Sequence, residues 1–387
     1  MTTARLIPVA RPWMDEREAD AARRAILSGW VTQGPEVAAF EREFAAAVDA
    51  AHACAVSSCT TALHLALLAC GIGPGDEVVT VSHSFIATAN AIRYCGATPV
   101  FVDVDPGTFN MDPRQLGPAI GPRTKAILAV HQLGMPCDLA AILEVAGPRS
   151  VPVIEDAACA MGSELRWNGR WEPVGRPHGS VACFSFHPRK LLSTGDGGML
   201  TTNDVAIDAR LRLLRQHGMS VPDTVRHQAS QVTFEDYPVL GFNYRMTDIQ
   251  AAIGREQLKR LPAIVARRRE LAARYRAALG RVRGVSLPLE PEWARSNWQS
   301  FAVRVAPGAQ RPVMQRLLDE GISTRRGVMN AHREEAYPPG TWRAAASLRC
   351  SEDAQDTSIV LPLFHDLDEA DQDRIVDALT RAVAALA

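Results

Sequence analysis

The sequence of 387 residues lacks the features that mark several large classes of protein. Its eight cysteines are scattered and none forms a Cys-x-x-Cys pair, so we expect buried free thiols and no metal centre. No apolar run approaches the roughly 18 residues of a membrane-spanning helix. The first twenty residues mix charged with apolar positions instead of forming a signal peptide. We therefore expect a cytoplasmic protein with no membrane partner.

Neither sign of charge predominates, because 42 Lys and Arg residues stand against 43 Asp and Glu residues and leave a formal net charge of -1. The sequence has no basic run and no alternation of basic with aromatic residues, so no nucleic-acid partner is expected. Hydrophobic residues make up 47% of the chain, which is enough to bury a full core in two domains. The composition is that of an ordinary globular protein.

Short apolar runs alternate with amphipathic helical stretches from residue 50 to about residue 205. This rhythm predicts an α/β fold with a mostly parallel sheet flanked by helices. Runs such as Pro99–Val102 are apolar throughout, which indicates strands covered on both faces. The expected strands are 52–56, 77–81, 99–104, 126–130, 151–155, 181–184 and 199–202.

The pattern changes after Thr247, a residue suited to cap a helix. A long helix is expected from there to about Leu279, followed by a mixture of strands and helices that predicts a smaller α+β domain. We therefore predict a large domain of residues 1–250, including an N-terminal helical arm. Residues 251–387 would then form a linker helix and a small C-terminal domain.

Three segments carry side chains that a single cofactor can use. Small hydroxyl residues around Thr60 lie where a strand ends and a helix begins, which favours an anion site as well as a plain helix cap. The strand 151–155 leads into Asp156 at the edge of the sheet where ligands bind. Lys190 precedes a Gly-rich turn, where burial lowers the pKa of an amine, although a surface lysine is the ordinary alternative. Pyridoxal phosphate needs these three groups: a phosphate anchor, a carboxylate for the ring nitrogen and an amine for a Schiff base.

Further motifs follow one another along almost the whole chain. They are Ser28-Gly-Trp-Val-Thr-Gln-Gly-Pro35, Ser57-Ser-Cys-Thr-Thr-Ala-Leu63, Ser84-Phe-Ile-Ala-Thr-Ala-Asn90, Gly96-Ala-Thr-Pro-Val-Phe-Val-Asp103, Glu155-Asp-Ala-Ala158, Ser185-Phe-His-Pro-Arg-Lys190, Gly195-Asp-Gly-Gly198, Gly241-Phe-Asn-Tyr-Arg-Met-Thr-Asp248 and Leu361-Pro-Leu363. In this order they resemble the DegT/StrS family of sugar aminotransferases. That family depends on pyridoxal phosphate and has the fold called type I, with a large sheet domain and a smaller C-terminal domain.

The resemblance implies a role for each matching residue. Lys190 forms the Schiff base and later moves protons, Asp156 pairs with the ring nitrogen, and Phe85 stacks on the ring. Asn243 reaches across a dimer interface to the partner's cofactor, so a homodimer with shared sites is implied. The implied cofactor-binding residues are Ser58, Cys59, Thr60, Phe85, Asp156, Cys159, Ser185, Lys190 and Asn243. The residues expected around the substrate are Trp30, His187, Arg325, Arg326, His332 and Tyr337.

Two positions depart from the family's pattern. Cys59 stands where a small Gly is usual, which adds bulk beside the phosphate but keeps the backbone donor. Cys159 stands where Gln or His commonly reaches the 3-oxygen of the cofactor. A thiol is a weak donor, so this contact is lost or replaced by water, unless Cys159 is a neutral change in a buried slot.

The expected activity is transfer of an amino group from L-glutamate or L-glutamine to the keto group of a nucleotide-linked 4-keto-6-deoxy sugar. A keto-cyclitol is the alternative acceptor, and the sequence does not exclude it. The family's dehydratases have histidine in place of the lysine, so Lys190 argues against that activity. A non-catalytic regulator with this fold is a further alternative, but the chain shows neither an added helix-turn-helix segment nor a basic bias.

Overall fold

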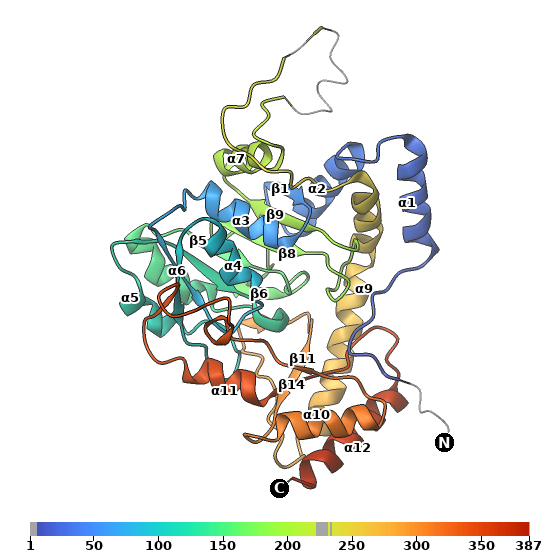
Figure 1. Ribbon diagram of the computed structural model, residues 1–387. Helices are drawn as coiled ribbons and strands as arrows, with labels where there is room; N and C mark the ends of the chain where they lie inside the picture. The colour runs from blue at the N-terminus through green and yellow to red at the C-terminus, as the bar shows by residue number, and fades with distance from the viewer. Residues whose placement is uncertain (1–5, 222–230, 233, 387) are drawn as a thin grey trace.

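The computed structural model describes residues 6–221, 231–232 and 234–386, and an eight-stranded sheet lies at its centre (Figure 1). Its strands are β1 (His52–Val56), β2 (Glu77–Val81), β3 (Thr98–Val102), β4 (Thr124–Val130), β5 (Val153–Asp156), β8 (Val181–Ser185), β9 (Gly198–Thr202) and β13 (Arg343–Ala344). They are arranged in the order β1-β9-β8-β5-β4-β2-β3-β13. All neighbours from β8 to β13 run parallel, whereas β9 is antiparallel to both β1 and β8. The predicted α/β fold with a mostly parallel sheet is confirmed.

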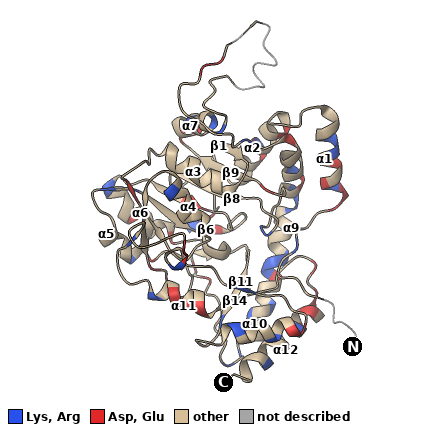
Figure 2. Cartoon of the chain, viewed as in Figure 1, with Lys and Arg blue, Asp and Glu red and all other residues tan. Residues whose placement is uncertain are grey.

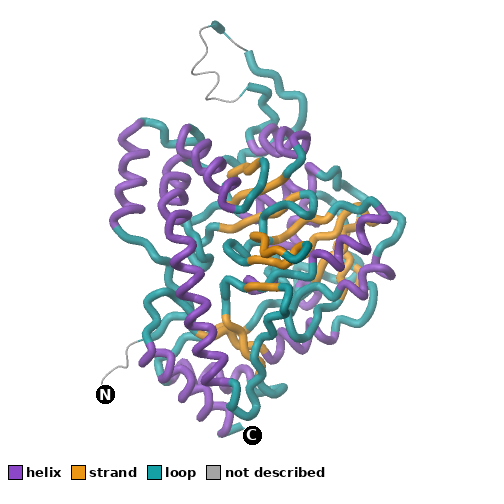
Figure 3. The backbone as a smooth tube through the Cα atoms, turned by 180° about the vertical axis from the view of Figure 1, so that it is seen from behind, coloured by secondary structure: helices purple, strands orange, loops and turns teal. Residues whose placement is uncertain are grey.

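Helices cover both faces of this sheet, as the rear view in Figure 3 also shows. They are α2 (Pro35–Ala47), α3 (Cys59–Ala69), α4 (Ala87–Tyr94), α5 (Leu116–Ala119), α6 (Leu139–Ala146), α7 (Val205–Arg215) and α9 (Asp248–Leu279), whereas α1 (Glu16–Ser28) packs on α9. Successive strand residues point to opposite faces. On β4, Leu128 packs with residues of α3, α4 and α7, while Ile127 and Ala129 pack with residues of α2, α6 and α9. Both faces of the sheet therefore need apolar side chains, and residues 126–130 of β4 form a continuous apolar run.

Helix α9 joins this core to a second one (Figure 1). Thr247 caps it as predicted, in a reciprocal pair with Gln250, and the helix then continues for 32 residues. The second core packs around a three-stranded sheet in the order β11-β14-β12. Its elements are β11 (Phe301–Arg304), α10 (Gln310–Asp319), β12 (Arg325–Arg326), β14 (Ser358–Leu361) and α12 (Glu369–Ala384). Because α9 contributes residues to both cores, the division into domains near residue 250 stays a prediction.

Several elements have bounds that were not predicted from the sequence, among them the helix of the N-terminal arm. Helix α1 begins at a capping box in which Asp15 and Glu18 bond each other's backbone N–H groups, a signal that is readable in the sequence. The other elements without a predicted range include α5, α7, β12, β13 and β14, together with β6 (Glu164–Trp167), β7 (Arg170–Pro173), β10 (Ala294–Arg295), α11 (Arg349–Thr357) and 3₁₀ turns at Pro113–Gln115, Gln132–Gly134, Gly147–Arg149 and Ala331–Arg333. Figure 2 shows basic and acidic residues interspersed along the described chain. No helix within the described residues combines the length and apolar character needed to cross a membrane.

Candidate active site

The N-terminus of α3 forms one wall of the site. Ser58 caps this helix, because its hydroxyl accepts the Thr61 N–H at 3.2 Å. Of the two roles considered for these hydroxyl residues, anion binding and helix capping, Ser58 therefore has the second. The Thr60 hydroxyl, in contrast, has no hydrogen-bond partner among the described residues. The first N–H groups of a helix lack acceptors within the helix, so this end can receive an anion. Gly198 of β9 lies close to the start of α3, so that a Cβ added to this glycine would stand 2.6 Å from the carbonyl carbon and oxygen of Ser58.

Asp156 lies at the carboxyl end of β5 and is 5% exposed. Its Oδ2 accepts the Thr88 hydroxyl at 2.7 Å, and its Oδ1 accepts the Ala158 N–H at 3.2 Å. Thr88 is in turn 2.7 Å from the Ser84 hydroxyl. These donors fix the orientation of the carboxylate, which can accept a further hydrogen bond from a ring N–H.

The neighbouring acid, Glu155, faces the other way and is fully buried. Its Oε2 lies 3.0 Å from Nε2 of His131, whose Nδ1 accepts the Cys137 N–H at 3.1 Å. A nitrogen that accepts an N–H carries no proton, so Nε2 of His131 is the donor to Glu155. Because successive side chains of β5 alternate, one acid serves this buried pair and the other, Asp156, is left for a ligand.

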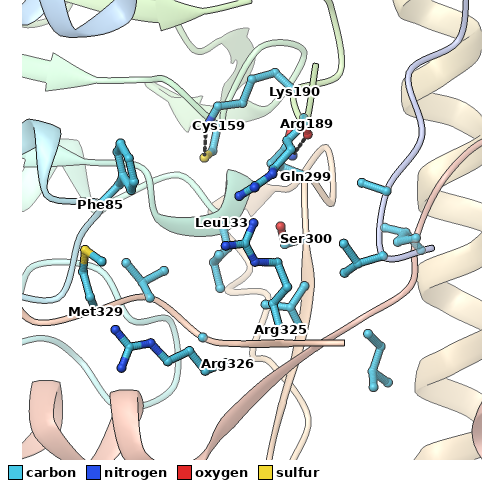
Figure 4. A pocket seen from close by; sticks show the side chains of 17 residues that line it. Phe85, Leu133, Cys159, Arg189, Lys190, Gln299, Ser300, Arg325, Arg326 and Met329 are labelled. Atoms are coloured by element: carbon cyan, nitrogen blue, oxygen red, sulfur yellow. Dashed lines mark hydrogen bonds between the residues drawn. The ribbon is translucent and has the colours of Figure 1, made fainter. Parts of the chain in front are cut away.

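Lys190 follows β8, and its Nζ donates to Sγ of Cys159 at 3.0 Å (Figure 4). Burial alone lowers the pKa of this amine, but Cys159, which accepts its hydrogen bond, and the charge of Asp156 outweigh burial and raise the pKa above its ordinary value. The lowered pKa expected from the sequence is therefore wrong for this environment. Burial, together with the charge of Asp156, raises the pKa of the Cys59 thiol well above its ordinary value, so this thiol adds no negative charge beside the anion site.

A cavity of about 230 Å³ opens in front of Lys190, between the end of the large sheet and strands β12 and β14. Phe85 is 65% exposed at its edge, which leaves the ring face open to a ligand. The predicted residues that the cavity brings together are Phe85, Cys159, Lys190, Arg325 and Arg326. Sequence reasoning missed Arg189 and Gln299. The position of Arg189 directly before Lys190 was a usable signal, but nothing in the sequence singled out Gln299.

Two predicted substrate residues lie outside this cavity and are held by other partners. The imidazole of His332 lies between Ser82 and Glu352, with Nδ1 2.6 Å from Oγ and Nε2 3.1 Å from Oε1. The Tyr337 hydroxyl donates to Oδ1 of Asn90 at 2.7 Å, and this tyrosine is 3% exposed. Both side chains join the segment after β12 to the large sheet and its helices.

The remaining predicted residues also lie outside the lining of the cavity. His187 is exposed in the turn after β8, where its Nδ1 accepts the Arg189 N–H and burial lowers its pKa. Ser185, at the end of β8, accepts the His187 N–H at 3.5 Å and no other hydrogen bond from the residues that the structure describes. Trp30 is half-buried beside Gly34, and Asn243 is exposed.

These groups suit pyridoxal phosphate. Asp156 supplies an oriented carboxylate, Lys190 an amine, and the end of α3 an anion site that Gly198 keeps free of a side chain. Phe85 supplies an exposed aromatic face. The residues present therefore match the phosphate, the ring nitrogen, the carbonyl and the ring plane of that cofactor.

Comparison with known proteins agrees with this chemistry. Residues 12–380 match the model of the DegT/DnrJ/EryC1/StrS aminotransferase family. GDP-perosamine synthase of Caulobacter vibrioides is 40% identical over 385 residues, which cover 97% of this chain and 98% of the relative. The solved structure of the aminotransferase TlmJ from Streptoalloteichus hindustanus superposes with a TM-score of 0.90 at 36% identity, over 99% of this chain and 100% of TlmJ. That of S. venezuelae DesV, in complex with a ketimine intermediate, gives 0.86 at 34% identity over 97% and 98% of the two chains. The chain therefore belongs to the DegT/DnrJ/EryC1/StrS aminotransferase family and is a sugar aminotransferase that depends on pyridoxal phosphate.

Proposed function

We propose that the enzyme moves an amino group from L-glutamate or L-glutamine to the keto group of a nucleotide-linked 4-keto-6-deoxy sugar. The observation that carries the proposal is the cavity in front of Lys190, which is lined by Arg189, Arg325 and Arg326 and, as far as the structure describes the chain, by no acidic residue. Such a cavity favours negatively charged substrates. The 40% identity with a GDP-perosamine synthase, whose name refers to a GDP-linked sugar, supports a nucleotide-linked acceptor.

Pyridoxal phosphate, when bound, supplies an electron sink for the amino carbon of the substrate. The roles proposed for the protein follow from the geometry. Lys190 takes the proton from that carbon and returns it, because its amine is the basic group at the cavity floor. Asp156 keeps the ring nitrogen protonated, Thr60 and Ser185 hold the phosphate, and Phe85 covers the ring.

We further propose that the enzyme acts as a homodimer in which each subunit completes the other's site. The loop that leads to Asn243 projects away from α7 in Figure 1 and exposes large apolar side chains. Val232 is 86% exposed, and Phe234 and Leu240 are each 87% exposed. A second subunit would bury these side chains, and Asn243 at the base of the loop is free to reach a partner.

Mixing two inactive variants tests this sharing. Lys190→Ala and Asn243→Ala chains, denatured together and refolded, should recover activity, because one site of each mixed dimer then holds both residues. Each variant refolded alone is the matched control. A fully active monomer in light scattering would contradict the dimer.

The acceptor is tested by incubating the purified holoenzyme with L-glutamate or L-glutamine and a panel of acceptors. The panel contains 4-keto-6-deoxyhexoses linked to dTDP, UDP and GDP, and a keto-cyclitol. Mass spectrometry of the products should show amination of a nucleotide-linked sugar, and none with Lys190→Ala. Amination of the cyclitol alone would refute the proposed acceptor.

A further inference from the structure

Residues 297–299 form a turn beside the contact between Lys190 and Cys159. Asn297 begins this turn and is fully buried. Its Nδ2 donates to the backbone oxygens of Cys159 and Met161, at 2.8 Å in both cases. The 297–299 turn therefore holds the backbone that carries Cys159, whose Sγ accepts the hydrogen bond from Nζ of Lys190.

The other end of the same turn holds the backbone that carries Lys190. Gln299 is 8% exposed, and its Nε2 donates to the backbone oxygen of Arg189, the residue directly before Lys190. Figure 4 draws this bond together with the bond from Lys190 to Cys159. The N–H of Gln299 also donates to Oδ1 of Asn297 at 2.8 Å, which links the two amides. One short segment thus fastens both sides of the Nζ–Sγ contact.

The backbone of the turn is strained at its centre. Trp298 has φ +51°, a left-handed conformation that residues other than glycine rarely adopt. Such strain persists only where surrounding contacts impose it, and it is concentrated at functional sites. The indole is 4% exposed and lies 5.5 Å from the ring of Phe301, measured between centroids. The side chain is thus fixed in the second core, and a further contact must hold the backbone.

Arg268 of α9 supplies this contact. Its Nη1 donates to the backbone oxygens of Trp298 and Gln299, at 3.0 and 3.2 Å. The side chain is 4% exposed and forms no ion pair with any residue that the structure describes, and burial lowers its pKa to about 10. A buried cation without an acid is costly to the fold. What Arg268 provides in return is a fixed position for two carbonyl groups of the turn.

We propose that Arg268 and Gln299 are positioning residues for Lys190: Arg268 fixes the 297–299 turn, and the turn fixes the amine beside Cys159. This assignment rests on the role proposed for Lys190 above. That role needs the amine within reach of the cofactor's carbonyl carbon and of the substrate's amino carbon. A reacting group misplaced by about 1 Å loses on the order of 100-fold in rate. Arg268 therefore acts on the reaction through the backbone, from outside the lining of the cavity.

Binding of two forms of the cofactor to the full-length apoenzyme tests this assignment. The aldehyde of pyridoxal phosphate condenses with the amine of Lys190 and releases water, whereas pyridoxamine phosphate cannot form this bond. The ratio of the two dissociation constants therefore reports how well Lys190 is placed, separately from the rest of the site. Gln299→Met removes the donor to Arg189, and Arg268→Met removes the donors to the turn. Each should raise the Kd for pyridoxal phosphate roughly tenfold or more, and that for pyridoxamine phosphate less than about threefold.

Arg267→Met is the matched control. Arg267 is the neighbour of Arg268 on α9 and also donates to two backbone oxygens, but these belong to His365 and Leu367 and not to the turn. Its substitution should leave the ratio of the two constants within about threefold of the wild type. Arg268→Lys keeps a charged donor and should stay closer to the wild type than Arg268→Met. Gln299→Met decides the case if Arg268→Met does not fold, because its side chain borders the cavity.

The half-reaction of the holoenzyme with its amino donor gives a second readout. In Gln299→Met the limiting rate should fall roughly 10- to 100-fold, while the half-saturating donor concentration changes less than about threefold. A raised half-saturating concentration with an unchanged limiting rate would make Gln299 a ligand contact and overturn its positioning role. Equal weakening of both cofactor forms, or a wild-type ratio in Gln299→Met, would also overturn it.

Lys190→Ala separates the role of the turn from that of Lys190 itself. This variant should bind both forms of the cofactor with nearly equal affinity, because the bond that distinguishes them is gone. A wild-type ratio in Lys190→Ala would refute the role of Lys190 and leave the turn no amine to position. A changed ratio in Lys190→Ala with a wild-type ratio in Gln299→Met would refute the turn alone. No sugar takes part in either measurement, so a wrong acceptor in the proposed function leaves the test intact.

Discussion

Replacing Gly198 by Ala tests whether the end of α3 is the phosphate site. The new Cβ would stand 2.6 Å from the carbonyl carbon and oxygen of Ser58 and 2.8 Å from the Cys59 nitrogen. These are backbone atoms, so no side chain can rotate away. An ordinary contact begins at 3.4 Å, so the end of α3 must retreat from β9 by about 0.8 Å.

This displacement has two separable effects. Forcing a carbon into a packed contact costs roughly 1–3 kcal/mol of the free energy of unfolding. A hydrogen bond of about 2.9 Å that lengthens by 0.8 Å leaves the effective range. Loss of one charge-assisted bond to the phosphate weakens binding roughly 10- to 100-fold. Gly198→Ala should therefore lower the urea midpoint of the apoenzyme and raise the Kd for pyridoxal phosphate.

Gly195→Ala is the matched control. Gly195 has φ +88° and no atom within 4 Å of an added Cβ, so its substitution introduces backbone strain of roughly 1–2 kcal/mol without a contact at α3. It should lower the urea midpoint and leave the cofactor Kd close to that of the wild type. If Gly198→Ala lost stability but bound the cofactor as tightly as Gly195→Ala, the phosphate would not lie at the end of α3.

Three further predictions concern single side chains. Lys190→Ala should still bind the cofactor through its phosphate and Asp156 but lose turnover, and borohydride should fix the cofactor on Lys190 alone in the wild type; peptide mapping to another lysine would contradict the assignment. Cys159→Gln should shift the pH at which the visible band changes by about half a unit or more, because an amide donates more strongly than a thiol; superimposable spectral titrations would mean that this side chain does not face the cofactor. Burial lowers the pKa of His83 to about 4 from 6.5, so between these values the unfolded chain binds a proton that the folded chain does not, and stability falls as the pH decreases from 6.5 to 4. Urea unfolding at pH 7 and at pH 4.5 gives the loss of unfolding free energy on acidification for each protein. This loss should be smaller in His83→Asn than in the wild type by on the order of 3 kcal/mol, and equal losses in both proteins would refute the role of His83.

The sequence by itself determined the elements whose signals are local. A strand buried on both faces is rich in apolar and β-branched residues, so β1 and β2 could be located to the residue, and Thr247 marked the start of α9. The order of motifs around Asp156 and Lys190 pointed to the cofactor and the family. Each of these residues follows the carboxyl end of a strand, which is the edge where a parallel sheet binds ligands.

Tertiary structure decided what depends on residues far apart in the chain. Periodicity shows that Glu155 and Asp156 face opposite ways, but only the position of His131 decides which of them is left for a ligand. Arg189 and Arg325 lie more than a hundred residues apart in the sequence, and no local pattern records that the fold brings both into the lining of one cavity. The direction of the Lys190 pKa also follows from neighbours brought in by separate strands and helices, since burial alone has the opposite effect.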